Sequence, residues 1–135
     1  MRSLLFCAAL LLGGAHATAA EPPCSAESKV PLTVQSWTAT PGRMGTEVQV
    51  TVKNSSGHAL KMNDASLWFT DALGNRVGYG GISIDPDVHL DVGGEAALSV
   101  ETIGWERLTK ADPADFTATI CTKSLLTEEG AKLEF

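Results

Sequence analysis

The nine residues TEVQVTVKN (residues 46–54) decide the fold class of this chain. Valine occupies every second position in the middle of the stretch, and the positions between carry polar side chains. The valines are Val48, Val50 and Val52, and the polar residues are Glu47, Gln49, Thr51 and Lys53. Successive side chains of a strand point to opposite faces, so this pattern predicts a half-buried β-strand.

The same alternation recurs along most of the chain, and helical periodicity is nearly absent. Further strands are expected at residues 30–37, 65–70, 76–80, 95–103, 115–121 and 131–135. Turn-forming residues separate them, and the turn DALGN (71–75) predicts a hairpin with a loop of three to five residues. Residues 105–110 predict one helical turn. Seven or eight short strands with such turns indicate an antiparallel β-sandwich, with a small barrel as the alternative.

The first twenty residues read as a cleaved secretory signal peptide. Arg2 precedes an apolar run at residues 4–12, and small residues before position 20 form an A-x-A-type cleavage site. The run is too short to span a hydrocarbon core of roughly 30 Å as a helix. We therefore expect cleavage after Ala19 or Ala20, one folded domain at residues 21–135 without membrane insertion, and a periplasmic or extracellular location.

Two cysteines, Cys24 and Cys121, remain after the signal. An even number of cysteines in an exported chain predicts a structural disulfide. The alternative is a redox or metal-binding thiol pair, but catalytic pairs are usually spaced C-x-x-C, and these two are not.

The charge balance disfavours nucleic acid as a partner. The chain has 10 basic and 16 acidic residues, and removal of Arg2 leaves 9 and 16, a net charge of −7. Binding to a phosphate backbone needs a basic surface. Anionic membrane surfaces are disfavoured for the same reason.

Four motifs stand out in the middle of the chain: Lys53 to Gly57, Phe69 to Asp71, the D-x-x-G turn from Asp71 to Gly74, and Asp91 to Val100. Together they resemble the FxLYD-type immunoglobulin-like modules of exported bacterial proteins. The resemblance covers about residues 48–100, with "WFTD" where the family has Leu-Tyr-Asp and Gly93 where proline is usual. What it implies is an all-β, antiparallel immunoglobulin-like β-sandwich that acts as an accessory or binding module, with no catalytic residues to carry over.

The segment IDPDVHLDVGG (84–94) allows two interpretations. In an extended chain its polar residues share one face, where they could bind calcium or zinc; these residues are Asp85, Asp87, His89 and Asp91. The simpler interpretation is an edge strand with an acidic, solvent-facing side, since Pro86 cannot donate to a strand ladder and edge charges prevent unwanted pairing. We favour the edge strand.

Thioether and imidazole groups define a possible copper site. The candidate ligands are His58 and Met62, with Met44 and His89. The turn residues just before His58 give the simpler explanation, a surface residue that follows a turn. We therefore predict no cofactor.

Trp37, Trp68 and Trp105 are candidates for an aromatic binding surface, with Trp68 opposite the apolar face of its strand. Packing under a loop is the simpler role for Trp68. Asn54 begins a glycosylation sequon, NSS. A G-x-S-x-G nucleophile motif is missing from the sequence, so catalysis is not expected. The expected function is recognition of an unknown protein or cell-envelope component. Metal binding and inhibition of an exported enzyme are the alternatives.

Overall fold

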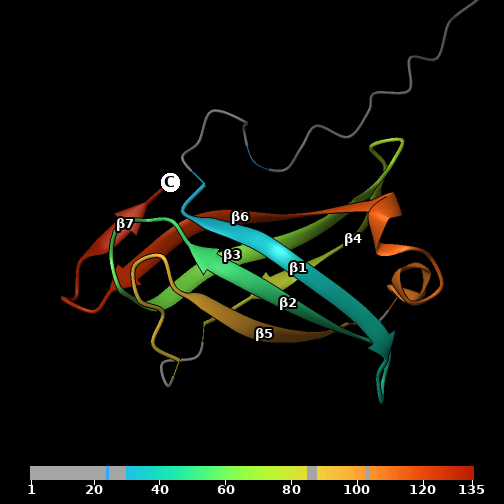
Figure 1. Cartoon of the computed structure of the whole chain (residues 1–135), viewed down its shortest axis with the longest axis horizontal. Coiled ribbons are helices and arrows are strands. Elements are labelled where there is room, and N and C mark those ends of the chain that lie inside the picture. The colour runs from blue at the N-terminus through green and yellow to red at the C-terminus, as the bar shows by residue number, and fades with distance from the viewer. Residues whose placement is uncertain (1–23, 25–29, 85–87, 103) are drawn as a thin grey trace, which may run out of the picture.

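The computed structural model describes residues 24, 30–84, 88–102 and 104–135. Within them, seven strands form two antiparallel sheets, which is consistent with a β-sandwich. Figure 1 shows the layer β1-β2-β5 and the layer β4-β3-β6-β7. The strands are β1 (Leu32–Pro41), β2 (Thr46–Asn54), β3 (Leu60–Asp71), β4 (Arg76–Ile82), β5 (Glu95–Thr102), β6 (Phe116–Thr127) and β7 (Lys132–Glu134). The predicted signal peptide lies outside the described residues.

The alternating valines predicted β2 correctly, since Val48, Val50 and Val52 are all buried. β2 is the central strand of its sheet and pairs with β1 on one side and β5 on the other. In β1 a bulge between Val34 and Ser36 shifts the register. The bulge reverses the alternation, so that Trp37 also faces inward and is partly buried.

The four-stranded sheet is built around β3, whose apolar positions Ala65, Leu67 and Phe69 are buried as predicted. The predicted hairpin is also confirmed, because β3 ends at Asp71 and β4 begins at Arg76. The predicted helical turn is a 3-10 helix, η1 (Glu106–Thr109), and a second one, η2 (Pro113–Asp115), follows it.

Aromatic side chains fill the core near one end of the two sheets. Phe69 contacts Trp37 and Trp105 edge to face, with ring centroids 4.9 Å and 5.5 Å away. The ring of Trp105 lies against the backbone of Gly78 in β4, where a Cβ atom would come within 2.4 Å of the indole Nε1. A side chain at this position would therefore displace the ring.

The buried side chain of Asn54 joins the loop after β2 to the segment before β5. Its Nδ2 group donates to the carbonyl oxygens of His58 (2.7 Å), Leu90 (3.1 Å) and Asp91 (3.0 Å). Its Oδ1 atom accepts from the backbone and the hydroxyl of Ser56. Since Asn54 has no exposed surface and its amide is fully used, a glycan on this sequon is incompatible with the fold.

The predicted edge strand at residues 84–94 is wrong for the part of it that the structure describes. Leu90 makes only an isolated bridge with Leu60, and a turn from Asp91 to Gly94 follows. The reason is that the turn begins directly after Leu90: the Asp91 carbonyl accepts hydrogen bonds from the Gly94 amide and from Asn54 Nδ2, so it takes no part in a strand ladder. Residues 85–87, including Asp85 and Asp87, lie outside the described residues.

Candidate functional site

A stacked pair of aromatic rings lies on the outer face of the four-stranded sheet. Trp68 of β3 and Tyr79 of β4 are directly opposite each other, with ring centroids 4.8 Å apart and planes inclined by 22°. The guanidinium carbon of Arg76 lies 5.4 Å from the Trp68 ring and 5.2 Å from the Tyr79 ring, within range of a cation–π interaction. Tyr79 keeps 57% of its surface exposed. We call these three residues the aromatic cluster.

A bulge in β4 brings the cluster together. Phe69 pairs with Gly78, but Thr70 pairs with Arg76, so Val77 is an extra residue. In a regular strand, Arg76 and Tyr79 would point to opposite faces of the sheet because they are three positions apart, and the bulge puts both on the outer face. The sequence predicted that Trp68 points outward, which is confirmed, but gave no sign of the bulge that selects its partners.

The disulfide lies on the same outer face. Cys24 and Cys121 are bonded with their Cα atoms 5.4 Å apart, which confirms the predicted pair. Cys121 pairs across the sheet with Ser66, whose hydroxyl accepts a hydrogen bond of 2.7 Å from the Trp68 indole. Directly opposite residues share a face, so the bond holds Cys24 beside the aromatic cluster.

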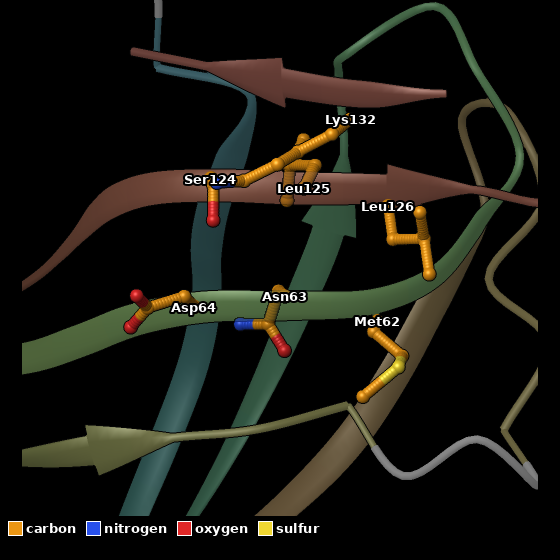
Figure 2. A pocket seen from close by; sticks show the side chains of 7 residues that line it. All are labelled: Met62, Asn63, Asp64, Ser124, Leu125, Leu126 and Lys132. Carbon is orange, nitrogen blue, oxygen red and sulfur yellow. The ribbon is translucent and has the colours of Figure 1, made fainter. Parts of the chain in front are cut away.

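An apolar hollow of about 260 Å³ opens farther along β3 and β6. Figure 2 shows side chains from β3, β6 and β7 around it. They are Met62, Asn63, Asp64, Ser124, Leu125, Leu126 and Lys132. Met62 and Leu126 are opposite each other, and Met62 is 43% exposed, so the hollow offers apolar contact area to a partner.

The charges around this hollow are paired within the sheet. Lys123 Nζ lies 3.8 Å from Asp64, and Lys132 Nζ lies 2.7 Å from Glu134. The hydrogen bond and charge of Glu134 raise the pKa of Lys132, and those of Lys132 lower the pKa of Glu134. These four charges sum to zero, so the hollow does not select a ligand by net charge.

A second hollow, of about 440 Å³, lies between the β3–β4 turn and the two 3-10 helices. Asp71 accepts hydrogen bonds from the backbone of Leu73 and of Asn75 and lies 3.8 Å from Arg107. The pKa of Asp71 is lowered, chiefly by the backbone hydrogen bond from Asn75, with further contributions from the Asn75 side chain, Leu73 and Arg107. The Asp71 carboxylate is therefore occupied by hydrogen bonds that hold the turn. Compared with this hollow, the aromatic cluster offers the more exposed side chains, since Tyr79 is 57% exposed.

The other two tryptophans do not contribute to an outer surface. Trp105 is 5% exposed and belongs to the core, so its predicted place on a binding surface is wrong. Trp37 faces inward and packs against Phe69 and Phe116, at 4.9 Å and 6.3 Å between ring centroids. The physical reasons are the bulge in β1 for Trp37 and the space over Gly78 for Trp105.

The predicted metal ligands that the structure describes do not form one site. His89 is 75% exposed at its side chain and pairs with Glu128 at 2.8 Å. Met44 lies in the turn before β2 and His58 in the loop after it, so a strand of roughly 25–30 Å separates these two residues. Met62 lines the apolar hollow. No group of three or more His, Cys, Asp or Glu side chains that could hold a metal ion occurs in the described part of the chain.

Sequence reasoning missed Tyr79, Arg76 and the residues of the apolar hollow other than Met62, which was a candidate for a different role, as a copper ligand. The alternation in RVGYG predicted the strand, and only the bulge at Val77 places Tyr79 opposite Trp68. The place of Asn54 in a hydrogen-bonded turn could have been predicted, because the motif Lys53 to Gly57 is typical of a turn.

Comparisons with protein-family models, curated proteins and solved structures found no match to this chain. None of the helices in residues 24, 30–84, 88–102 and 104–135 is long and apolar enough to cross a membrane.

Proposed function

We propose that this chain is an exported, non-catalytic immunoglobulin-like module that binds a protein or cell-envelope component through the outer face of its four-stranded sheet. The aromatic cluster is the observation that carries the proposal. Tryptophan, tyrosine and arginine are the residue types that contribute most to protein interfaces. The two aromatic side chains offer large contact area with few rotatable bonds, and the planar guanidinium of arginine stacks on rings and carries several hydrogen-bond donors. Here one of each is stacked on one face, and a 57% exposed Tyr79 remains free to make contacts.

The strand order supports the immunoglobulin-like part of the proposal. Constant-type domains place strands A, B, E and D in one sheet and C, F and G in the other. In chain order, β1, β2 and β5 correspond to A, B and E, and β3, β6 and β7 to C, F and G, while strand D has no counterpart among the described strands. β4 extends the second sheet, as the additional strands of variable-type domains do.

Turn chemistry supports the likeness to FxLYD-type modules. Asn54 and Gly57, in the first motif, form the hydrogen-bonded loop after β2, and Gly57 has a φ of +80°. Asp71 and Gly74, in the D-x-x-G motif, close the β3–β4 turn with a hydrogen bond of 2.9 Å. These motif residues form the turns of the fold, as expected for a family whose motifs consist mostly of turn residues.

The disulfide supports export, because such bonds form and persist in oxidising compartments. N-terminal sequencing of the protein recovered from the periplasm or medium tests this part of the proposal. We expect the chain to begin at Ala20 or Glu21. An intact Met1 in that fraction would contradict the expectation.

The binding role is tested by affinity capture from host envelope extract with the oxidised mature protein. Tyr79→Ala and Arg76→Ala remove contact area from an exposed surface, so the fold should persist. A matched control is Gln49→Ala, since Gln49 is exposed on the opposite outer face. We expect a specific partner to be retained by the control and lost by both cluster variants. Equal capture by all proteins would refute the assignment of this face.

A further inference from the structure

The outer face around the aromatic cluster is polar and carries no carboxylate. Directly opposite residues of β4, β3 and β6 form three rows across this face. The rows are Arg76–Thr70–Thr117, Tyr79–Trp68–Thr119 and Gly81–Ser66–Cys121. The chain has 16 acidic residues, yet none occupies these nine positions, and Arg76 is the only charged residue among them. The face is therefore locally positive and rich in hydroxyl groups.

One side of the Tyr79 ring is open. Its other side stacks on Trp68, with 4.8 Å between the ring centroids. Arg76 lies beside the stacked pair and not over the open side, because its guanidinium carbon is almost equally far from the two rings, at 5.4 Å and 5.2 Å. β4 is an edge strand of its sheet, and a Cβ atom at Gly81, two positions farther along the same face, would meet nothing within 4 Å. A flat ligand can therefore reach the open side of the ring.

Arg76 has hydrogen-bond donors available for a ligand. Its side chain is exposed, and no carboxylate in the described part of the chain pairs with it. By contrast, the two acidic residues of β3 are both paired, Asp71 with Arg107 and Asp64 with Lys123, each at 3.8 Å. A guanidinium binds a carboxylate through two parallel hydrogen bonds. The group that complements the charge of this face is therefore a carboxylate.

The net negative charge of the chain does not cancel this local preference. Three acidic side chains of the other sheet lie on the opposite outer face; they are Glu47, Glu95 and Glu101. The two sheets of a sandwich pack about 10 Å apart, whereas the Debye length at physiological ionic strength is about 8 Å. Salt therefore screens most of the repulsion that these carboxylates exert on a ligand at Arg76.

We propose that the ligand of this face is an envelope oligosaccharide that bears a carboxylate, an inference that rests on the proposed binding function and makes it more specific. The C–H hydrogens on one face of a sugar ring are slightly positive, so they pack on the electron-rich face of an aromatic ring such as Tyr79. The sugar hydroxyls exchange hydrogen bonds with the threonine hydroxyls of the face, and Arg76 binds the carboxylate. A protein interface has an apolar centre, whereas hydroxyl groups and a glycine surround Tyr79 here.

The test uses soluble glycan from the host envelope, digested with protease so that no folded protein remains. Binding to the oxidised mature protein is measured by calorimetry. We expect binding that is lost when acid hydrolysis breaks the glycan into monosaccharides. Conversion of the glycan carboxylates to neutral amides should weaken binding roughly tenfold or more, because a hydrogen-bonded ion pair is lost. Binding that amidation leaves unchanged would overturn the proposed carboxylate.

Variants of the cluster assign the binding to this face. Tyr79→Ala should abolish binding, whereas Tyr79→Phe keeps the ring and should bind within a fewfold of the wild type. Arg76→Gln should bind the native and the amidated glycan equally, because it has lost the charge that distinguishes them. Gln49→Ala, exposed on the opposite outer face, is the matched control and should bind as the wild type does.

The inference and the proposed function fail in different ways. A partner that protease digestion destroys, and whose binding still depends on Tyr79, would be a protein; this result would overturn the glycan and leave the binding role of the face intact. Glycan binding that Tyr79→Ala does not weaken would place the site elsewhere and refute the inference. No Tyr79-dependent binding to either digested or undigested extract would refute the inference and the proposed function together.

Discussion

Replacing Asn54 should destabilise the protein far more than replacing an exposed polar side chain of the same strand. Asn54 is fully buried, and its side chain makes five hydrogen-bond contacts, in which the two protons of Nδ2 are shared among three carbonyl oxygens. A hydrogen bond is worth about 1 kcal/mol net on average, and the contacts that involve Ser56 lie at a part-exposed loop, where water can replace them. Because Asn54→Ala removes both donor protons, it should lower the free energy of unfolding by about 2 kcal/mol.

The expected loss stays at about 2 kcal/mol because each of the three carbonyl acceptors keeps another hydrogen-bond donor when the Asn54 amide is removed. Each keeps one other donor: the Ser56 hydroxyl for His58, the Leu60 amide for Leu90, and the Gly94 amide for Asp91. The full penalty for a buried unsatisfied group therefore does not apply. A small domain has about 5–15 kcal/mol of stability in total, so the variant should still fold.

Asn54→Asp tests the hydrogen bonds of the amide separately from its packing, because it removes the NH2 donor and keeps the side-chain volume nearly constant. The carboxyl of this variant has nearly the shape of the amide, but an acceptor oxygen faces the three carbonyl oxygens in place of their donor. Burial and these oxygens raise its pKa in the folded state above the unfolded value. A raised pKa means that stability present at low pH is lost as pH rises. The variant should therefore be less stable at pH 7 than at pH 4, relative to the wild type.

Urea unfolding of the oxidised protein, followed by tryptophan fluorescence, measures these differences. Gln49→Ala, an exposed polar residue on the same strand, is the control and should change stability by less than about 0.5 kcal/mol. If Asn54→Asp were as stable as the wild type at pH 7, the role assigned to the amide would be wrong.

Three further predictions follow from the core, the turn and the disulfide. Gly78→Ala places a methyl group against the Trp105 ring and should lower the free energy of unfolding, measured in urea, by about 3 kcal/mol. Gly81→Ala, which has open space around it, is the control and should change that free energy by less than about 0.5 kcal/mol. Equal effects of the two substitutions would contradict the packing of the indole ring. The pKa of the Asp71 carboxyl, measured by NMR, should lie below the usual value of 3.8. Its contribution to stability is therefore present above pH 3.8 and is lost as pH falls through the lowered pKa. A pKa at or above 3.8 would show that its hydrogen bonds do not persist in solution. Loss of the disulfide through Cys121→Ser opens a loop of 97 residues and should lower stability by up to about 4–5 kcal/mol without abolishing the fold; two titratable thiols in the unreduced wild type would contradict the bond itself.

The strands were predictable because alternation of apolar and polar residues records which face is buried. The three valines of β2 and the apolar positions of β3 show this directly. The pairing of the cysteines was predictable as well, since only two remain after the expected cleavage.

Bulges and space-filling contacts were not predictable from alternation. The extra residue Val77 puts Arg76 and Tyr79 on one face, and the bulge in β1 turns Trp37 inward. The place of Trp105 depends on the space that Gly78 leaves in a strand distant in sequence. Periodicity describes each strand alone, so it cannot report such features of pairing and packing.

The segment 84–94 shows a related limit of sequence patterns. Alternation predicted a strand, but pairing stops at the Leu60–Leu90 bridge, and the Asp91 carbonyl is bound by the Gly94 amide and by the Asn54 side chain. A turn held by hydrogen bonds to a residue distant in sequence therefore decides the local structure. This effect has no counterpart in the periodicity of the segment itself.

Site-specific photo-crosslinking in the producing cells tests the proposed binding face most directly. A photoreactive amino acid replaces Tyr79 in one variant and Gln49 in another, so that the two probes sit on opposite outer faces of the sandwich. Both positions are exposed, so each probe can be accommodated. We predict a discrete crosslinked product from position 79 that is weaker or absent from position 49. Products of equal yield at both positions, or a product at position 49 alone, would contradict the assignment of partner binding to the aromatic cluster.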